Sequence, residues 1–269
     1  MSPLHKQSNS VLCKATKLKN MAEKHYYKDA FERASEERKN IILEMGIEEF
    51  ASKGYENANV NVIAKKAGIS IGLMYKYFST KEDLFITCLQ RGTKVLEDAL
   101  YDIMDSDDKL LVKAEKLIRT MVRHSKQNSN YIKMYNEITA EKDLKRAAAM
   151  VDEIESKRSY IYNTSIRQAL EKGDVRTDLE PGMFSFFLDN LLTSLLFSYT
   201  CDYYRERFRV YTGIDINEAE DEEIVRQLLK FVESAFTFEK DWAYNEILHN
   251  IGVEASLSEF SASATEDRL

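Results

Sequence analysis

Apolar side chains recur at every third or fourth position along most of the chain, which is the spacing that buries one face of an α-helix. Glycines, polar clusters and capping residues separate these stretches, so each stretch is expected to form its own helix. The helices expected from this pattern cover residues 35–53, 60–67, 71–78, 80–104, 110–122, 131–138, 144–172, 181–204 and 224–235. The fold class predicted from the pattern is all-α.

Composition supports this fold class. Only 9 Gly and 2 Pro occur among 269 residues, too few for the turns of a sandwich, a barrel or a doubly wound sheet. The 3 Cys and the lack of a secretory leader fit a reducing compartment, so a cytoplasmic location is expected. The most apolar stretch, residues 183–199, contains Asp189 and falls short of the roughly 20 apolar residues of a membrane span. No membrane partner is expected.

Charge is distributed unevenly along the chain. Residues 1–91 hold 15 Lys and Arg against 11 Asp and Glu, whereas residues 92–269 hold 23 against 34. A basic first part beside an acidic remainder indicates two surfaces with different partners, and nucleic acid would suit the first. Chance variation in charge is the alternative.

Two short helices stand around a tight turn near residue 68. Asn59 is placed to cap the first helix and Ser70 the second, with Gly68 between them. The length of the connection and its central glycine are those of a helix-turn-helix. Ser79 and Glu82 then have the spacing of a capping box that opens the next helix. Gly46, inside the helix before the motif, is expected where another helix packs closely.

The helix over 71–78 has the composition of a recognition helix that enters a groove of DNA. Small and polar residues stand at its N-terminal end, and aromatic and basic residues that suit phosphate follow. Lys81 stands in the first turn of the next helix, where the helix dipole and a cation together favour phosphate. A helix-turn-helix that serves protein contacts only is the alternative. The candidate DNA-binding residues are Asn59, Asn61, Lys65, Ser70, Ile71, Gly72, Leu73, Tyr75, Lys76, Tyr77 and Lys81.

These residues belong to a longer stretch that resembles a known family. Residues 38–55, 63–70, 72–78 and 81–84 are similar, in both residue types and spacing, to the DNA-binding domain of TetR-family (tetracycline-repressor-like) transcription regulators. A second, weaker resemblance covers residues 168–181, a pattern that often joins the penultimate helices in that family.

The resemblance implies a homodimer that reads a palindromic operator in double-stranded DNA, and a helical domain that binds a small-molecule effector. It implies phosphate contacts for Tyr75 and Lys81, close backbone approach at Gly72, and a cap that also touches the DNA backbone at Ser70. Nearest the bases it places Asn61, Ile71, Leu73, Lys76 and Tyr77.

The sequence departs from the family pattern at three of these positions. The family often has Thr where Asn59 stands, and a polar or small residue where Ile71 and Leu73 stand. Two apolar groups there favour contact with thymine methyl groups or weak direct readout.

Four segments are expected along the chain. A flexible basic arm spans residues 1–34, the helix-turn-helix domain spans 35–84, the helical regulatory and dimerisation domain spans 85–250, and a flexible tail spans 251–269.

The helix over residues 183–199 is apolar in nearly every direction, which indicates burial on both sides. One face would meet its own domain and the other a partner subunit, beside the helix over 224–236. A wholly internal helix of a monomer is the alternative. The predicted dimer-interface residues are Phe184, Leu188, Leu191, Leu195, Ile224, Leu228 and Phe231.

An effector site is harder to place. Met and aromatic residues at helical spacing are more often plain core than ligand contacts, but several could line a cavity for a largely apolar or amphipathic effector. The candidate ligand-binding residues are Met121, Tyr131, Met134, Tyr135, Tyr160 and Phe187. His124 and Arg123 are expected at the surface.

Catalytic patterns are missing from the sequence. There is no phosphate loop, no nucleophile elbow and no zinc-protease motif, and the three Cys have no metal-site spacing. We therefore expect no catalytic residue, no metal site and no cofactor. The sequence favours a DNA-binding regulator, most simply a repressor released by its effector. The alternative is a helical ligand-binding protein or enzyme with a vestigial helix-turn-helix.

Overall fold

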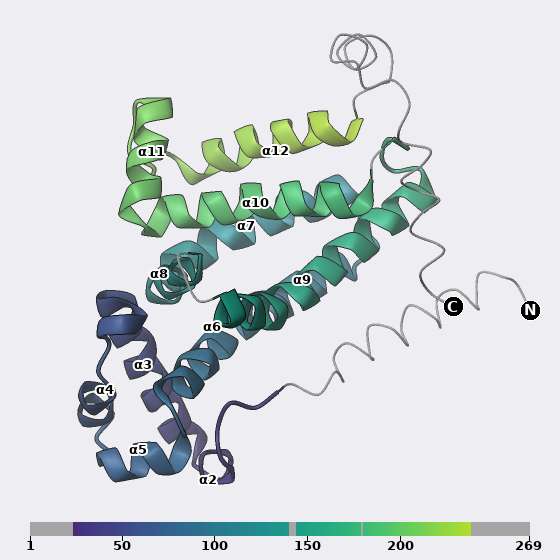
Figure 1. The fold of residues 1–269 in the computed structure, drawn as a ribbon. Helices are drawn as coiled ribbons and strands as arrows, with labels where there is room; N and C mark the ends of the chain where they lie inside the picture. The colour runs from purple at the N-terminus through teal and green to yellow at the C-terminus, as the bar shows by residue number, and fades with distance from the viewer. Residues whose placement is uncertain (1–23, 140–143, 179, 238–269) are drawn as a thin grey trace, which may run out of the picture.

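The computed structural model describes residues 24–139, 144–178 and 180–237, and all regular structure in these ranges is helical (Figure 1). The predicted all-α fold is confirmed. The helices are α2 (Asp29–Glu32), α3 (Glu36–Asn57), α4 (Val60–Lys66), α5 (Ile71–Tyr77), α6 (Lys81–Met104), α7 (Leu110–Gln127), α8 (Ser129–Ile138), α9 (Leu144–Lys172), α10 (Pro181–Thr200), α11 (Asp202–Thr212) and α12 (Asp221–Thr237).

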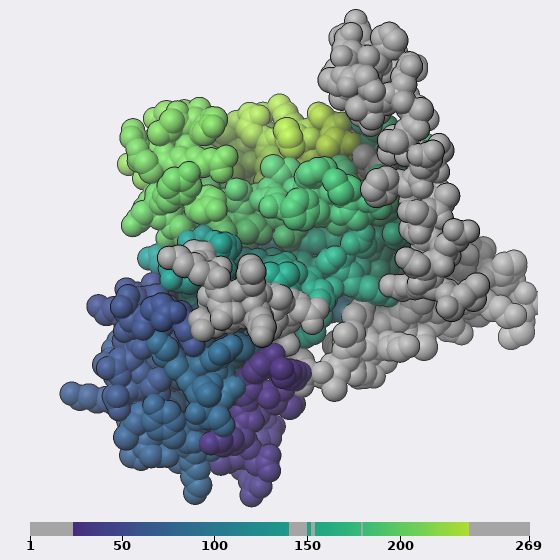
Figure 2. All heavy atoms as spheres, viewed as in Figure 1, coloured from purple at the N-terminus to yellow at the C-terminus, as the bar shows by residue number. Residues whose placement is uncertain are grey.

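The helices form two units, which we call the head (residues 24–80) and the body (residues 105–237). Figure 2 shows the head, in purple and blue, at one end of the teal and green body. Helix α6 joins them and runs without interruption from the head into the body (Figure 1). The second contact between the units is made by α8, which packs against α3.

Close packing of α3 against α6 depends on a glycine, Gly46, which has no side chain. A Cβ atom at Gly46 of α3 would lie 2.7 Å from Cys88 Sγ of α6, so only glycine lets the two helices approach this closely. The close packing predicted at Gly46 is therefore confirmed. At the end of α3, Gly54 adopts a φ of 70°, and a short turn through Asn57 follows this kink.

The cap that opens α6 differs by one residue from the predicted one. Thr80, not Ser79, is the N-cap: its hydroxyl accepts from the Asp83 N–H, and the Asp83 carboxylate accepts from the Thr80 N–H. The sequence Ser-Thr-Lys-Glu-Asp allows either frame, because both have a hydroxyl followed three residues later by an acid.

The arm predicted to span residues 1–34 has structure from residue 24 on. Phe31 is buried, with ring centroids 4.7 Å from Phe78 and 5.4 Å from Tyr77. Lys28 donates its backbone N–H to the Tyr77 carbonyl and its ammonium to the Tyr75 carbonyl, both at 2.8 Å. Residues 24–34 thus brace the C-terminal end of α5. The remainder of the predicted arm, and the predicted tail at 251–269, lie outside the described residues.

In the body, α10 packs against α7, α8, α9 and α11. The predicted helix over 181–204 is wrong at its end, because the extended backbone of Cys201 separates α10 from α11. Apolar periodicity continues into Tyr203 and Tyr204, so it could not show this break. Within the described ranges, no helix combines the length and apolarity needed to cross a membrane.

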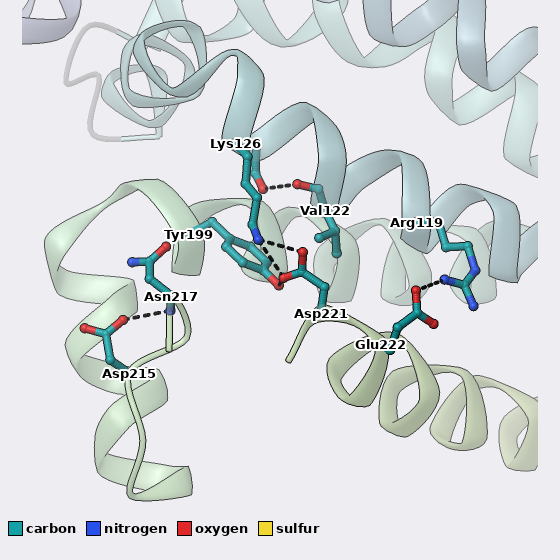
Figure 3. Close-up of polar contacts among 9 residues, drawn as sticks. Arg119, Val122, Lys126, Tyr199, Asp215, Asn217, Asp221 and Glu222 are labelled. Carbon is teal, nitrogen blue, oxygen red and sulfur yellow. Dashed lines mark hydrogen bonds and ion pairs between the residues drawn. The ribbon is translucent and has the colours of Figure 1, made fainter. Parts of the chain in front are cut away.

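Two ion pairs attach the N-terminus of α12 to α7 (Figure 3). Arg119 pairs with Glu222 at 2.6 Å, and Lys126 pairs with Asp221 at 2.6 Å. The Tyr199 hydroxyl of α10 also donates to Asp221, at 3.1 Å. The acidic side chains in the first turn of α12 also interact favourably with the helix dipole. Together with the two ion pairs, they fix the position at which α12 begins.

Replacement of Phe31 by Ala should lower the free energy of unfolding by about 3–5 kcal/mol, the usual cost of removing a large aromatic ring from a core. Chemical denaturation measures this change. Tyr211→Ala is the control, because that side chain is 80% exposed and its loss should change stability by less than about 0.5 kcal/mol. Equal stability of Phe31→Ala and the parent would show that residues 24–34 do not belong to the head.

Candidate nucleic-acid interface and effector site

Helices α4 and α5 are held at a fixed angle by a short turn and local caps. Asn59 Oδ1 accepts from the Asn61 backbone N–H at 2.9 Å, and Ser70 Oγ accepts from the Leu73 N–H at 3.2 Å. Gly68 in the turn has a φ of 68°, which favours glycine. These contacts involve only neighbouring residues, which is why the sequence was sufficient to predict them.

One surface of this motif faces solvent. Ile63, Ala64 and Met74 are buried and hold the two helices to the head. The predicted DNA-binding residues that are exposed are Asn59, Asn61, Lys65, Ser70, Ile71, Gly72, Tyr75 and Lys76. Eight of the eleven predicted residues are therefore exposed, and they include polar, aromatic and basic groups.

Tyr77 does not belong to this surface. It is 4% exposed because its ring packs against Phe31, so the expectation that Tyr77 lies nearest the bases is corrected. The periodicity of α5 alone could not reveal this packing, since it depends on α2. Leu73 is half-buried against the core of the head.

Lys81 has a structural role that the sequence did not reveal. Its ammonium donates to the backbone carbonyls of Tyr55, Glu56 and Ala58 at 2.7, 3.0 and 3.5 Å, and lies 4.7 Å from the Tyr55 ring centroid. Carbonyls at the end of a helix need such donors. Lys81 thus fastens the end of α3 to the start of α6, and its phosphate contact stays a prediction.

A small chamber of about 10 Å³ lies inside the body, between α6, α7, α8, α9 and α10. This is space for about one water molecule. Its apolar wall is formed by Leu96, Leu100, Ile132 and Leu196, and its polar wall by Thr93, Glu97, His124, Tyr131, Tyr135 and Arg158.

Arg158 organises the polar wall. It is 4% exposed and donates to the Tyr135 hydroxyl at 3.0 Å and to Glu155 Oε1 at 2.8 Å. Its Nε lies 3.6 Å from Asp189 Oδ1, within ion-pair distance but too long for a hydrogen bond. Burial raises the pKa of Asp189 and raises the pKa of Tyr131 to about 12.

The chamber includes only part of the predicted effector set. Tyr131 and Tyr135 line it. Met121 and Met134 are fully buried core residues outside its lining, and Tyr160 and Phe187 are exposed at the surface, so these four predicted ligand contacts are not supported. His124, expected at the surface, is 6% exposed and lines the chamber.

Sequence reasoning did not assign two charged residues to a site, Arg158, which is buried, and Asp189, which is half-buried. Arg158 stands on the apolar face of α9, four residues after Ile154 and three before Ile161. Asp189 interrupts the apolar run of α10. A charge at a position where helical spacing requires an apolar side chain was the available signal.

Residues 42–88 match the family model described as "Bacterial regulatory proteins, tetR family". The match covers α4 and α5 together with most of α3 and the first turns of α6. In these helices the chain therefore resembles the TetR-family regulators.

Some curated relatives and solved structures are similar to the chain over most of their own length. The chain is 24% identical over 163 residues to the HTH-type transcriptional regulator YhgD of Bacillus subtilis, whose function is uncharacterised; these residues make up 61% of this chain and 84% of YhgD. A solved structure of a Clostridium perfringens protein described as a fatty acid metabolism regulator aligns with a TM-score of 0.60 and 20% identity, over 74% of this chain and all of that one. The transcriptional regulator FadR from Bacillus subtilis, solved in complex with stearoyl-CoA, aligns with a TM-score of 0.57 and 16% identity. The alignment covers 71% of this chain and 96% of FadR. The structural likenesses show a shared fold.

The body has exposed apolar side chains on α10 and α12. Met183, Phe186, Phe187 and Leu191 of α10 and Phe231 of α12 are each at least 36% exposed. By contrast, Leu188 and Leu195 are buried within the chain, so their assignment to a dimer interface is corrected. Phe184, Ile224 and Leu228 are half-buried.

Among the described residues, no group of three or more His, Cys, Asp and Glu side chains is placed to hold a metal ion.

Lys76→Met should weaken DNA binding and make it less sensitive to salt, without changing the melting temperature. Removing one cation that neutralises a DNA phosphate reduces the slope of log K against log salt by about 0.9. Fluorescence anisotropy at several salt concentrations measures both effects. An unchanged slope would show that the exposed face of α5 does not lie on DNA.

Lys81→Met is the matched comparison. Because three carbonyls lose their donor, this substitution should lower the free energy of unfolding by about 1–2 kcal/mol, which thermal denaturation would detect. Wild-type stability would mean that the contacts of Lys81 with α3 contribute nothing to the head.

Proposed function

We propose that the protein is a homodimeric repressor that binds a palindromic operator through α5 and is released by a small effector. The observation that carries the proposal is the exposed polar and basic surface of a helix-turn-helix whose residues match the TetR family model. A cytoplasmic location follows from the DNA partner. The domain limits proposed are 35–84 for DNA binding, braced by residues 24–34, and 85–250 for regulation and dimerisation.

The exposed face of α10 and α12 supports the dimer. Large apolar side chains gathered on one face of a monomer are typical of a protein–protein interface. Phe186 and Phe187 lie with ring centroids 5.9 Å apart, and Phe231 is 60% exposed. A two-fold axis through this face would bury these rings and place two copies of α5 on the same DNA.

An acyl-CoA is the effector class we propose. The chamber has room for only about one water molecule, but its walls are apolar on one side and polar on the other, so that once widened it would suit an acyl chain with a carbonyl at its end. FadR from Bacillus subtilis, which shares the fold, is solved with stearoyl-CoA.

The packing around Tyr131 supports a route from effector to DNA. A Cβ at Gly92 of α6 would lie 1.9 Å from the Tyr131 ring, and the Tyr131 hydroxyl shares a 3.1 Å hydrogen bond with Thr93. A ligand that widens the chamber must move this ring, and the ring rests on the helix that leads to the head. A coupling free energy of about 1–3 kcal/mol would change operator affinity about 5- to 150-fold.

The proposal is tested by selecting binding sites from random double-stranded DNA with the purified protein. We expect palindromes whose half-sites lie about 34–36 Å apart, or a multiple of one helical turn. Adding stearoyl-CoA should weaken binding to the selected sequence. Enrichment of no sequence, or of single half-sites only, would overturn the proposal of a palindromic operator.

Phe187→Glu combined with Phe231→Glu should convert the dimer to a monomer, because four carboxylates would have to be buried in the interface. Analytical ultracentrifugation measures the mass, and operator affinity should fall at least tenfold. Tyr203→Glu, at a side chain that is 74% exposed on α11, is the control and should leave the dimer intact. A dimeric double variant would exclude this face.

Gly92→Ala should lower the free energy of unfolding by about 1–3 kcal/mol, since the added methyl group overlaps the Tyr131 ring. In a Tyr131→Ala background the same substitution should cost less than about 0.5 kcal/mol, because the overlap is gone. Chemical denaturation of the four proteins completes the cycle. Additive costs would show that Tyr131 does not press on α6.

A further inference from the structure

One carboxylate of the head is buried. Glu49 of α3 is 5% exposed, and among the residues that the structure describes no other Asp or Glu is buried as deeply. Its neighbour Glu48, by contrast, is exposed. Burying a charge is costly unless polar partners compensate for the lost water. The partners of Glu49 therefore indicate what this carboxylate does.

Both partners of Glu49 belong to the ends of α4. Glu49 Oε1 accepts a long hydrogen bond of 3.4 Å from the backbone N–H of Asn59, the N-cap of α4. Glu49 Oε2 lies 3.7 Å from Nζ of Lys66, the last residue of α4, which is within ion-pair distance. A single side chain of α3 thus contacts both ends of the first helix of the helix-turn-helix.

Helix α4 has few other contacts that could fix its direction. It is seven residues long and packs against α3 (Figure 1), and its buried side chains are Ile63 and Ala64. Apolar burial is non-directional, so these two side chains alone would let a short helix rotate or slide on α3. A hydrogen bond and an ion pair to one carboxylate are satisfied in a single arrangement. Glu49 therefore supplies the direction that the apolar contacts lack.

The end of α4 that Glu49 holds leads directly to the candidate DNA-binding residues. Asn59 Oδ1 accepts from the backbone N–H and the side-chain amide of Asn61, at 2.9 and 3.1 Å. Asn59 and Asn61 are both exposed. The chain before Asn59 is held by Lys81, which donates to the Ala58 carbonyl at 3.5 Å. A shift of this end of α4 would move both asparagines.

Lys66 is engaged within the head. Its ammonium lies 2.9 Å from Glu48 Oε1 and 3.7 Å from Glu49 Oε2, and the hydrogen bond with Glu48 raises the pKa of Lys66. Two carboxylates thus face one ammonium. Because the Lys66 side chain is 38% exposed and would keep Glu48, loss of the Glu49 carboxylate leaves no buried charge without a partner.

From these contacts we propose that Glu49 is a positioning residue of the helix-turn-helix, which fixes α4 on α3 so that the exposed side chains of α4 and α5 meet the bases of the operator. This inference rests on the proposed function and deepens it, because it assigns sequence selectivity to a side chain that does not touch DNA. Phosphate contacts tolerate a small shift of α4, whereas contacts with base edges depend on direction. Loss of Glu49 lowers selectivity more than it lowers affinity for DNA in general.

Glu49→Leu tests this role, because it replaces the carboxylate by an apolar side chain of similar size. Replacing a buried charge in this way is often neutral for stability when no partner is left buried and unpaired, so the variant should melt within about 4 °C of the parent. Fluorescence anisotropy compares the operator selected by the parent with shuffled DNA of equal length. The ratio of the two affinities should fall about tenfold or more, the effect of one lost base contact.

Two further variants provide the matched controls. Glu48→Leu removes the same charge from the neighbouring, exposed position, which does not contact Asn59, so the affinity ratio should stay within about threefold of the parent. Glu49→Gln keeps an acceptor for the Asn59 N–H and should rescue the ratio to within about threefold. A change in net charge alone would affect all three variants equally.

Hydrogen–deuterium exchange reports the hold on α4 without DNA. In Glu49→Leu the amides of α4 should exchange about tenfold faster or more than in the parent, because local opening becomes easier. The amides of α3 that precede Glu49 should exchange as in the parent, and Glu48→Leu should change neither helix.

The outcomes separate this inference from the proposed function. An unchanged affinity ratio in Glu49→Leu overturns the inference while the proposed function stands, and so does an equal fall in Glu48→Leu. Unfolding of Glu49→Leu also overturns it, because Glu49 would then be needed for the fold as a whole. If the parent selects no operator, the proposed function fails, and the exchange of α4 still decides whether Glu49 fixes this helix: faster exchange supports that role and unchanged exchange overturns it.

Discussion

The structure depends on a single rigid element, the helix α6, which is packed at both ends. Its 24 residues span about 36 Å at 1.5 Å per residue, with no break in the described backbone. In the head it is fixed by the contact of Cys88 with Gly46 and by Lys81 on the carbonyls that end α3. In the body it forms one wall of the chamber, and the Tyr131 ring lies directly on Gly92. In the proposed mechanism, this close packing would carry a shift at the chamber along α6 to the head.

The polar cluster around Arg158 lies beside α6 in the wall of the chamber. A core built for stability alone would place apolar side chains at the positions of Arg158 and Asp189. Here the guanidinium is held by Glu155 and Tyr135, while one atom of Arg158 and one of Asp189 stay without hydrogen bonds. An incompletely satisfied network is expensive in the absence of a ligand and favourable in its presence. In the proposed mechanism, this difference would allow a bound molecule to change the balance between two arrangements of the body.

Local interactions explain which features the sequence could predict. The caps at Asn59 and Ser70 and the glycine turn involve residues that are neighbours in the chain, so the helix-turn-helix was recognisable without a structure. Tyr77 was assigned to the wrong surface because its position depends on Phe31, more than forty residues earlier. Helix α10 has apolar side chains on all sides, so no periodicity could show that Leu188 faces inward and Phe187 outward. Arg158 was overlooked because charged residues usually lie at the surface, and only its neighbours in space show why it is buried.

If occupation of the chamber moves the head through α6, the distance between the two copies of α5 in the proposed dimer must change. A spin label at Ser79→Cys, an exposed position just after α5 and outside the proposed DNA contacts, would report it in a chain with Cys13 replaced by Ser, since Cys88 and Cys201 are buried. On operator DNA the pulsed dipolar distance should centre near the separation of successive major grooves, about 34–36 Å. Stearoyl-CoA should shift and broaden this distribution as the operator is released. An identical distribution with and without stearoyl-CoA, in a protein that binds it, would contradict the account.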